Sequence, residues 1–233
     1  MKLVSPYRVI RATTKCHEHL AAIGFDWVRA LEMLAHSAKK YSKAETFAIT
    51  NQTLRVPHYA YQTREESLMI WILEISLAYL RSDDFDQDTV MISPDTLVLM
   101  DLKEKFCSTA WDLGVIVRPH PVVPILNFLQ FWPHHAKEKL IRFYTRCLHI
   151  GQGLDHHEKK WGGDTTPLIE LLEPVDYKMV DRAGMRVRMW AEREFISRVT
   201  YRTKLIMPKI GTVVDFRYFA KKRMVEVYEE LFK

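Results

Sequence analysis

The sequence predicts an α/β fold in which a mixed sheet is flanked by helices and followed by a basic helical C-terminal extension. Short apolar, β-branched runs alternate along the chain with segments whose apolar residues recur at helical spacing. The chain has 233 residues, of which 48% are hydrophobic and 12% aromatic, so it can bury a substantial core. No internal repeat is visible. These observations together favour a layered α/β architecture.

The first half of the chain alternates strand and helix signals. In the first helix the apolar side chains of residues 27–41 share one face, and in the second Leu68, Ile72 and Ile75 do so. The predicted elements are, in order, a strand at residues 7–12, a helix around 27–41, a strand at 46–50, a helix at 65–80, a polar turn at 83–88 and a strand at 89–92.

The second half is less regular because prolines and glycines interrupt it. Prolines between positions 119 and 124 break the chain after a predicted strand. Gly151 and Gly153 mark a predicted loop, and Asp164 is the predicted N-cap of a helix, a position that favours aspartate. The predicted elements are a strand at 112–117, a helix at 138–148, a helix from 162 to about 172, and a basic amphipathic helix that follows residues 213–217 and ends at 232.

Several classes of protein do not fit the composition. No apolar run reaches the about 20 residues needed to cross a bilayer. Residues 1–11 have neither a long apolar core nor a small-residue cleavage site, so we expect no signal peptide. Cys16, Cys107 and Cys147 are widely spaced and form neither a zinc motif nor a disulfide framework. We therefore expect a reducing, cytoplasmic location.

Positive charge is concentrated near the C-terminal end. The formal net charge is +5, and residues 182–223 hold twelve Lys and Arg against three acids. Such a block favours an anionic partner, which can be nucleotide phosphates, nucleic acid or an acidic surface. The alternative is a solvated face with no partner.

Residues 89–99 are the most informative stretch. The run is apolar and β-branched, stops at Ser93-Pro94-Asp95 and then becomes apolar again. A carboxylate at the end of a buried strand can hold a divalent cation or, through it, a phosphate. The alternative for Asp95 is a turn acid that hydrogen-bonds its own backbone.

Four segments occur in a fixed order along the chain. They are residues 92–98 (Ile-Ser-Pro-Asp-Thr-Leu-Val), residues 112–115 (Asp-Leu-Gly-Val) leading to Asn127-Phe128, residues 161–168 (Trp-Gly-Gly-Asp-Thr-Thr-Pro-Leu) and residues 215–221 (Asp-Phe-Arg-Tyr-Phe-Ala-Lys). Together they resemble the GT-A class of glycosyltransferases, which have a Rossmann-like fold and use nucleotide-diphosphate sugars. The first is similar to the metal-binding Asp-x-Asp motif, and the second to the stretch that samples sugar and acceptor. The third is similar to the Gly-rich turn near the donor sugar, and the fourth to the His-x-x-Gly-x-x-Lys segment of the glycogenin-like branch.

The chain departs from the pattern of that class at three positions. Ser93 stands where the Asp-x-Asp motif has its first acid. Asp215 stands where the histidine would be, and Tyr218 where the glycine would be. Mn²⁺ and Mg²⁺ accept oxygen ligands readily, so the resemblance still implies a metal site on Asp95 and Asp215.

The resemblance implies a donor site for a nucleotide-diphosphate sugar, with Mn²⁺ or Mg²⁺ as cofactor. Asp164, as a contact to the sugar hydroxyls, and Asn127 are the implied catalytic residues. A metal on Asp95 would bridge the phosphates, while Lys221 and Arg217 would neutralise the departing diphosphate. The other implied donor-binding residues are Arg11, Ala12, Thr13, Asn51 and Ser93.

The same resemblance implies one GT-A-like domain over residues 1–233. Residues 1–102 would form the nucleotide-binding half and residues 103–180 the acceptor and sugar half. Residues 181–233 would be a basic C-terminal segment that closes the site.

The acceptor stays open at this point. The block at 182–223 is interleaved with aromatic residues, which suits a polyanion such as DNA, and bacteriophages encode compact transferases that decorate modified bases. A protein, lipid-linked or polysaccharide acceptor is the other option. Two rival functions also remain: a non-catalytic nucleic-acid-binding protein, and a degenerate transferase scaffold suggested by Ser93. The sequence leaves the oligomeric state open.

Overall fold

A mixed sheet runs through the centre of the molecule. The computed structural model describes residues 1–8, 25–63, 67–106, 110–121, 123–173, 179–199 and 208–232. Within these ranges the sheet has eight strands, in the spatial order β3 (His58–Ala60), β2 (Glu45–Thr50), β1 (Lys2–Pro6), β4 (Thr89–Ile92), β7 (Ile125–Trp132), β6 (Leu113–Val117), β9 (Met185–Ala191) and β8 (Met179–Arg182). A smaller sheet has the order β10 (Ile196–Val199), β11 (Val213–Phe216) and β5 (Thr96–Val98).

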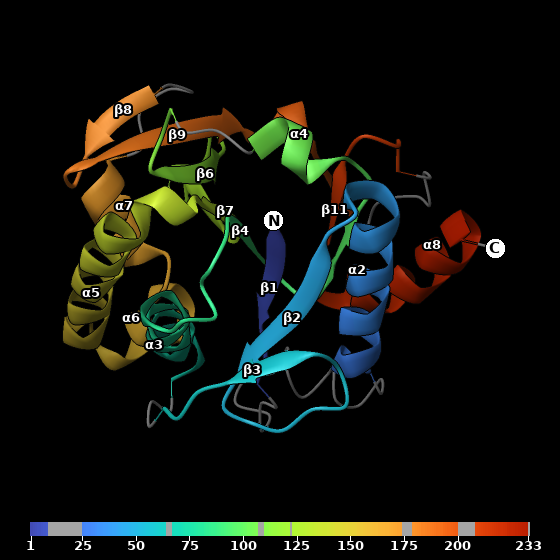
Figure 1. The fold of residues 1–233 in the computed structure, drawn as a ribbon, viewed down its shortest axis with the longest axis horizontal. Coiled ribbons are helices and arrows are strands. Elements are labelled where there is room, and N and C mark those ends of the chain that lie inside the picture. The colour runs from blue at the N-terminus through green and yellow to red at the C-terminus, as the bar shows by residue number, and fades with distance from the viewer. Residues whose placement is uncertain are drawn as a thin grey trace.

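Helices cover both faces of the large sheet (Figure 1). They are α2 (Trp27–Ser42), α3 (Leu68–Arg81), α4 (Leu102–Phe106), α5 (Lys137–Gly153), α6 (His156–Gly162), α7 (Thr166–Leu172) and α8 (Arg223–Phe232), with short 3₁₀ turns η1 (His134–Ala136), η2 (Glu192–Glu194) and η3 (Tyr218–Lys222). Helices α3, α5 and α7 pack on one face, and α2, α4 and the small sheet pack on the other. The fold class predicted from the sequence is confirmed.

Strand direction gives the large sheet one edge where most carboxyl ends meet. β1 runs parallel to β2 and β4, while β7 is antiparallel to both β4 and β6, so that β6 has the direction of β4. β9 is parallel to β6. The carboxyl ends of β1, β2, β4, β6 and β9 therefore share an edge with the amino end of β7. In open α/β sheets ligands bind at such an edge.

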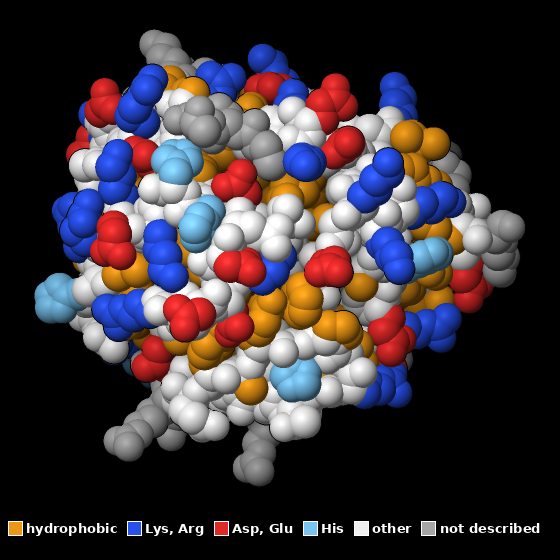
Figure 2. Space-filling model, in the orientation of Figure 1, with side chains coloured by type: hydrophobic (Ala, Val, Ile, Leu, Met, Phe, Trp, Pro, Cys, Tyr) orange, Lys and Arg blue, Asp and Glu red, His pale blue; other side chains and the backbone are white. Residues whose placement is uncertain are grey.

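Alternation along the strands divides the core between the two faces. In β4, Val90 and Ile92 pack with the cluster under α2 and α4, and Met91 packs with the cluster under α3 and α5. This is the period of two that a strand buried on both faces requires. On the outer surface, Lys and Arg side chains intermix with Asp and Glu over the face shown in Figure 2.

Serine hydroxyl groups tie α2 to the segment that follows Asp95. Asp26 is the N-cap of helix α2, and its side chain accepts hydrogen bonds from the backbone N–H groups of Val28 and Arg29. Near its other end, the hydroxyl of Ser37 accepts a 3.0 Å hydrogen bond from the backbone N–H of Val98 in β5. The Ser37 bond thereby ties the helix to β5 of the small sheet.

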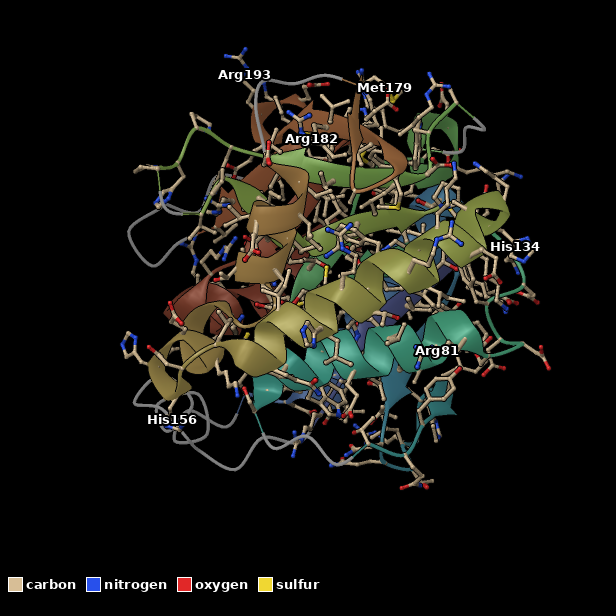
Figure 3. The ribbon with its side chains drawn as sticks, turned by 90° about the vertical axis from the view of Figure 1, so that its left-hand side faces the viewer. Arg81, His134, His156, Met179, Arg182 and Arg193 are labelled. Atoms are coloured by element: carbon tan, nitrogen blue, oxygen red, sulfur yellow. The ribbon has the colours of Figure 1, made fainter. Side chains whose placement is uncertain are left out.

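Glycine lets α5 approach the turn between α6 and α7. Helices α3 and α5 run side by side (Figure 3), with the Arg81 guanidinium donating a 3.2 Å hydrogen bond to the Thr145 hydroxyl. A Cβ atom on Gly151 of α5 would lie 2.9 Å from the carbonyl oxygen of Gly163 and 2.9 Å from Cδ1 of Ile70. The turn that carries Asp164 is thus held against both helices by a contact that only glycine permits.

Several elements differ from the sequence prediction. The first strand lies at Lys2–Pro6, ahead of the predicted 7–12; Tyr7 and Arg8 follow it, and residues 9–12 lie outside the described residues. Lys2 and Pro6 are untypical of a strand, so the sequence pattern does not reveal it. Lys2 is nevertheless buried, because its ammonium is 2.7 Å from the Asp86 carboxylate. Strands β3, β5, β7, β8, β9 and β10 and helices α4 and α6 were not predicted.

Three local predictions are wrong for identifiable reasons. Helix α5 continues through Gly151 and Gly153, where a loop was predicted. Gly151 allows the helix to pack closely against Gly163 and Ile70 and does not end it. Asp164 is not an N-cap, since α7 starts after Thr165. The final helix α8 is not basic: it holds one arginine and three glutamates, and the lysines Lys221 and Lys222 lie before it in η3.

We predict that Gly151→Ala lowers the free energy of unfolding by about 1–3 kcal/mol, because its methyl group overpacks the contact with Gly163 and Ile70. Gly153→Ala is the matched control in the same helix. A Cβ atom there has no neighbour within 4 Å, so this variant should be neutral or slightly more stable. Urea unfolding measures both; equal effects of the two changes would contradict the packing argument.

Candidate active site

The candidate site lies at the edge where the carboxyl ends of the parallel strands meet. Ser93 is the first residue after β4, Asn51 the first after β2, and Arg118 the first after β6. Asn127 is near the amino end of β7, at the same edge. Four strands that are far apart in the sequence therefore deliver polar side chains to one region.

Asp95 sits in a tight turn between β4 and β5 and is almost fully buried. The Ser93 hydroxyl and the Lys221 ammonium both contact its carboxylate. The turn is pinned to its neighbours, because the Ser93 N–H donates to the Phe128 carbonyl at 2.9 Å and the Phe216 N–H donates to the Asp95 carbonyl at 3.2 Å. The predicted residues Ser93, Asp95 and Lys221 are thus brought together.

Asp215 lies in β11 with two guanidinium groups around it. It is directly opposite Arg198 of β10, whose Nε is 3.3 Å from its Oδ2. The Nε of Arg217 lies 2.5 Å from the same oxygen. Arg198 also forms an ion pair with Glu192, with Nη2 2.5 Å from Oε1. The Arg217 guanidinium lies 5.3 Å from the centre of the Phe128 ring, a cation–π contact.

A third guanidinium belongs to the same group. Arg118 donates a 2.8 Å hydrogen bond from its Nε to the carbonyl oxygen of Val123. Burial, together with the positive charges of Arg198 and Arg217, lowers the pKa of Arg118. We call Arg118, Arg198 and Arg217 the arginine trio. Sequence reasoning missed two of its members.

Asp164 and Asn127 form the other half of the site. Asp164 is 3% exposed, and its carboxylate accepts hydrogen bonds from the Asn127 amide and, at 3.2 Å, from the Thr165 hydroxyl. Burial raises the pKa of Asp164 to about 6, and the hydrogen bonds from Thr165 and Asn127 oppose this rise. The structure brings the two residues predicted as catalytic into contact, although they are far apart in the sequence.

The remaining predicted donor-binding residues fall into two groups. Asn51 follows β2, and its Oδ1 is buried without a hydrogen-bond partner in the described part of the chain. A buried acceptor without a partner is costly, and a ligand hydroxyl or amino group would satisfy it. Arg11, Ala12 and Thr13 lie outside the described residues.

The carboxylates do not fit a divalent cation as they stand. Asp95 is engaged by an ammonium and a hydroxyl, and Asp215 by two guanidinium groups. Throughout the described ranges no group of three or more His, Cys, Asp or Glu side chains is placed to hold a metal ion. A cation here would have to displace Lys221 or members of the arginine trio. Metal binding by Asp95 and Asp215 stays a prediction.

Two functional candidates escaped the sequence analysis for different reasons. Arg118 is the first charged residue after a strand that was predicted, so the position of a polar residue at a strand end was a usable signal. Arg198 lies in the basic block, but its register opposite Asp215 depends on a pairing between two strands that the sequence did not reveal. Glu192, the ion-pair partner of Arg198, escaped the sequence analysis for the same reason, because it directly follows β9, a strand that was not predicted.

Several solved glycosyltransferase structures have a similar arrangement of elements. A glycosyltransferase involved in the glycosylation of the major capsid of PBCV-1 matches with a TM-score of 0.54 at 10% identity, covering 98% of both chains. The galactosyltransferase LgtC, in complex with donor and acceptor sugar analogs, matches with a TM-score of 0.51 at 11% identity, covering 100% of this chain and 97% of that one. The chain has the GT-A fold. The glycosyltransferase GlyE of Streptococcus pneumoniae TIGR4 also matches, with a TM-score of 0.55 at 10% identity over 99% of this chain and 63% of that one.

The resemblance stops at the fold. No protein-family model and no curated protein sequence matches this chain. At about 10% identity, the shared GT-A fold does not carry residue roles across, so the site rests on this chain's own geometry. Within the described residues, no helix is long and apolar enough to cross a membrane.

We predict that Asp164→Asn raises stability at neutral pH. The folded-state pKa of about 6 exceeds the ordinary pKa of an aspartate, so the folded state binds the proton more tightly. Its stabilising effect is present below about pH 4 and is lost as the pH rises to 6, a loss on the order of 3 kcal/mol. Urea unfolding from pH 4 to 8 should show that the free energy of unfolding of the variant rises relative to that of the wild type between pH 4 and 6. Parallel profiles would contradict the raised pKa.

Proposed function

We propose that this protein is a glycosyltransferase that moves a sugar from a nucleotide-diphosphate sugar to an acceptor hydroxyl. The observation that carries the proposal is the pairing of buried Asp164 with Asn127 at the same sheet edge as the arginine trio and Lys221. Hydrogen-bonding groups for a sugar and cations for a diphosphate are thereby placed at one edge of a GT-A fold. Such an edge is where α/β sheets bind ligands.

The reaction makes defined demands on the site. The bond between the anomeric carbon and the diphosphate oxygen breaks, and its electron pair leaves with the diphosphate. The acceptor hydroxyl oxygen forms the new bond to the anomeric carbon, and its proton leaves with the departing diphosphate. The site must therefore hold the sugar in line with the acceptor and stabilise negative charge on the leaving group.

The chain's residues divide between these two tasks. Asp164 accepts hydrogen bonds from sugar hydroxyl groups, and Asn127 holds its carboxylate in place. Asn51, with its unsatisfied buried oxygen, contacts the nucleotide at the end of β2. Lys221 and Arg217 face the diphosphate. Asp95 positions Lys221 through their ion pair.

The acceptor is proposed from the charge on the surface around residues 182–223. Of the block at 182–223, Arg198, Arg217 and Lys221 turn inward to carboxylates of the site. Other members are surface residues: Arg186 and Lys209 are exposed, and Arg193 projects from one end of the molecule in Figure 3. These outer cations support a polyanionic acceptor, of which a modified base in DNA is one and an acidic polysaccharide another. A bacteriophage origin and a cytoplasmic location remain sequence-based predictions.

The first test is thermal stability against a panel of nucleoside diphosphates and nucleotide sugars. A ligand that binds the folded state raises the melting temperature by mass action, about 2.7 kcal/mol of stabilisation at 100 times its Kd. We expect one nucleotide to shift the wild type. Asp164→Asn should keep the shift with the nucleoside diphosphate but lose at least about 100-fold in hydrolysis of the matching nucleotide sugar.

Asp155→Asn is the matched control for that experiment. Asp155 caps α6 at the surface and accepts a 2.8 Å hydrogen bond from the Glu158 N–H, a role that asparagine also fills. This variant should bind and hydrolyse like the wild type. No shift with any nucleotide would remove the enzyme proposal and favour the degenerate scaffold or the nucleic-acid-binding protein.

DNA as acceptor has a separate test. If the outer cations contact DNA, the electrophoretic mobility of a short duplex should shift at low salt. The affinity should then fall steeply between about 50 and 200 mM salt, as it does for other proteins that contact DNA phosphates. Replacing Arg186 and Arg193 with glutamine should weaken the shift and leave nucleotide binding unchanged. The absence of a shift at low salt would exclude DNA as the acceptor.

A further inference from the structure

We infer that this site binds the diphosphate of its donor with the chain's own cations, the arginine trio and Lys221, and needs no divalent metal to do so. The inference rests on the proposed function and specifies how the same site meets its substrate. Its basis is the set of ion pairs at the carboxyl edge of the sheet and the balance of charge that they leave.

Each acid suited by position to a metal already has cationic partners. The Asp95 carboxylate contacts the Lys221 ammonium, which also donates a 3.3 Å hydrogen bond to the Phe216 carbonyl oxygen. The Asp215 carboxylate has the Nε atoms of Arg198 and Arg217 at 3.3 and 2.5 Å. Both carboxylates are buried. Exchanging such partners for a hydrated cation would leave guanidinium or ammonium groups without counterions in a partly buried place, which is costly.

The balance of charge favours an anion. Among the described residues of this cluster, the arginine trio and Lys221 face three carboxylates, those of Asp95, Asp215 and Glu192. These groups by themselves carry one net positive charge, and the Asp164 carboxylate belongs to the other half of the site, on the Asn127 amide. A divalent cation would be repelled by that charge, whereas the dianionic diphosphate of a nucleotide sugar would be attracted.

The guanidinium groups are also held in place before any ligand arrives. Arg198 is fixed by its register opposite Asp215 and by Glu192, Arg217 by Asp215 and the Phe128 ring, and Arg118 by the Val123 carbonyl. Arginine offers a planar fork of donors that matches phosphate oxygens in pairs. Donors fixed in advance lose little entropy on binding, so they can take over the charge neutralisation that a metal gives.

The three guanidinium groups of the arginine trio repel one another when no anion is bound. Arg118 has the weakest claim on a carboxylate, because its Nε donates to a backbone carbonyl. Burial and the repulsion of the other two guanidinium groups also outweigh the attraction of Glu192 and Asp215. Replacing it should therefore relieve repulsion in the free protein and remove a phosphate contact in the complex. This opposite effect on stability and on binding separates a ligand-binding arginine from a structural one.

The experiment is titration calorimetry with UDP, GDP, ADP, CDP and dTDP, each in EDTA and in MnCl₂. We expect at least one of them to bind in EDTA, with a Kd within about threefold of the value in manganese. Arg118→Gln should weaken that binding by about tenfold or more, while its melting temperature without ligand equals or exceeds the wild-type value.

Arg142→Gln is the matched control. Arg142 is exposed in the first half of α5, which begins shortly after the carboxyl end of β7, at the sheet edge opposite the site. Because its side chain is remote from the arginine trio, the variant should bind nucleotide within about twofold of the wild type. As a second variant, Arg217→Lys keeps the charge but not the planar fork, and should fall between the wild type and Arg118→Gln.

Each other outcome overturns a different statement. Binding that appears only with manganese would overturn the inference and leave the proposed glycosyltransferase standing. Binding in EDTA that Arg118→Gln does not weaken would remove the arginine trio from the donor site. The absence of binding under both conditions would overturn the proposed function itself.

Discussion

A buried carboxylate between two guanidinium groups holds the site together. Asp215 is 3% exposed, so its ionised form is stabilised by the charge and hydrogen bonds of Arg198 and Arg217 rather than by water. It lies in β11, the central strand of the small sheet, between β10 and β5. Since β5 begins directly after Asp95, the position of Asp215 also sets where Asp95 and its partner Lys221 lie. Removing one partner of such a buried pair typically costs about 3–5 kcal/mol.

The other half of the site is positioned by packing and needs no ion pair. Asp164 is carried by a turn whose Gly163 meets Gly151 of α5, on the opposite face of the large sheet from the small sheet. Asn127 of β7 joins the two halves, because Phe128 beside it contacts Arg217 while its own amide reaches Asp164. A central strand thus sets the spacing between the carboxylate proposed to contact the sugar and the cations proposed to bind diphosphate.

Sequence reasoning succeeded where periodicity was strong and local. Helices α2 and α3 and strands β2 and β4 were found because their apolar residues repeat at 3.6 or form short β-branched runs. The position of β1 was predicted wrongly because Lys2 is buried through an ion pair with a residue more than 80 positions away, and no local pattern shows such a pair. The contact between Asn127 and Asp164, and the place of Arg198 opposite Asp215, depend on long-range pairing in the same way. The resemblance supplied the first pair, but nothing in the sequence supplied the second.

The departures from the GT-A motifs acquire a common physical meaning in this structure. Where the Asp-x-Asp motif would have its first acid, the Ser93 hydroxyl donates a hydrogen bond to Asp95, so one negative charge is replaced by a neutral donor. Where the histidine would be, Asp215 gathers two arginines. The first change removes a charge that would attract a metal, and the second recruits fixed cations to the same edge. Both changes therefore suit the inferred direct binding of an anion better than the binding of a cation, and each alone would leave the charge of the cluster less suited to a diphosphate.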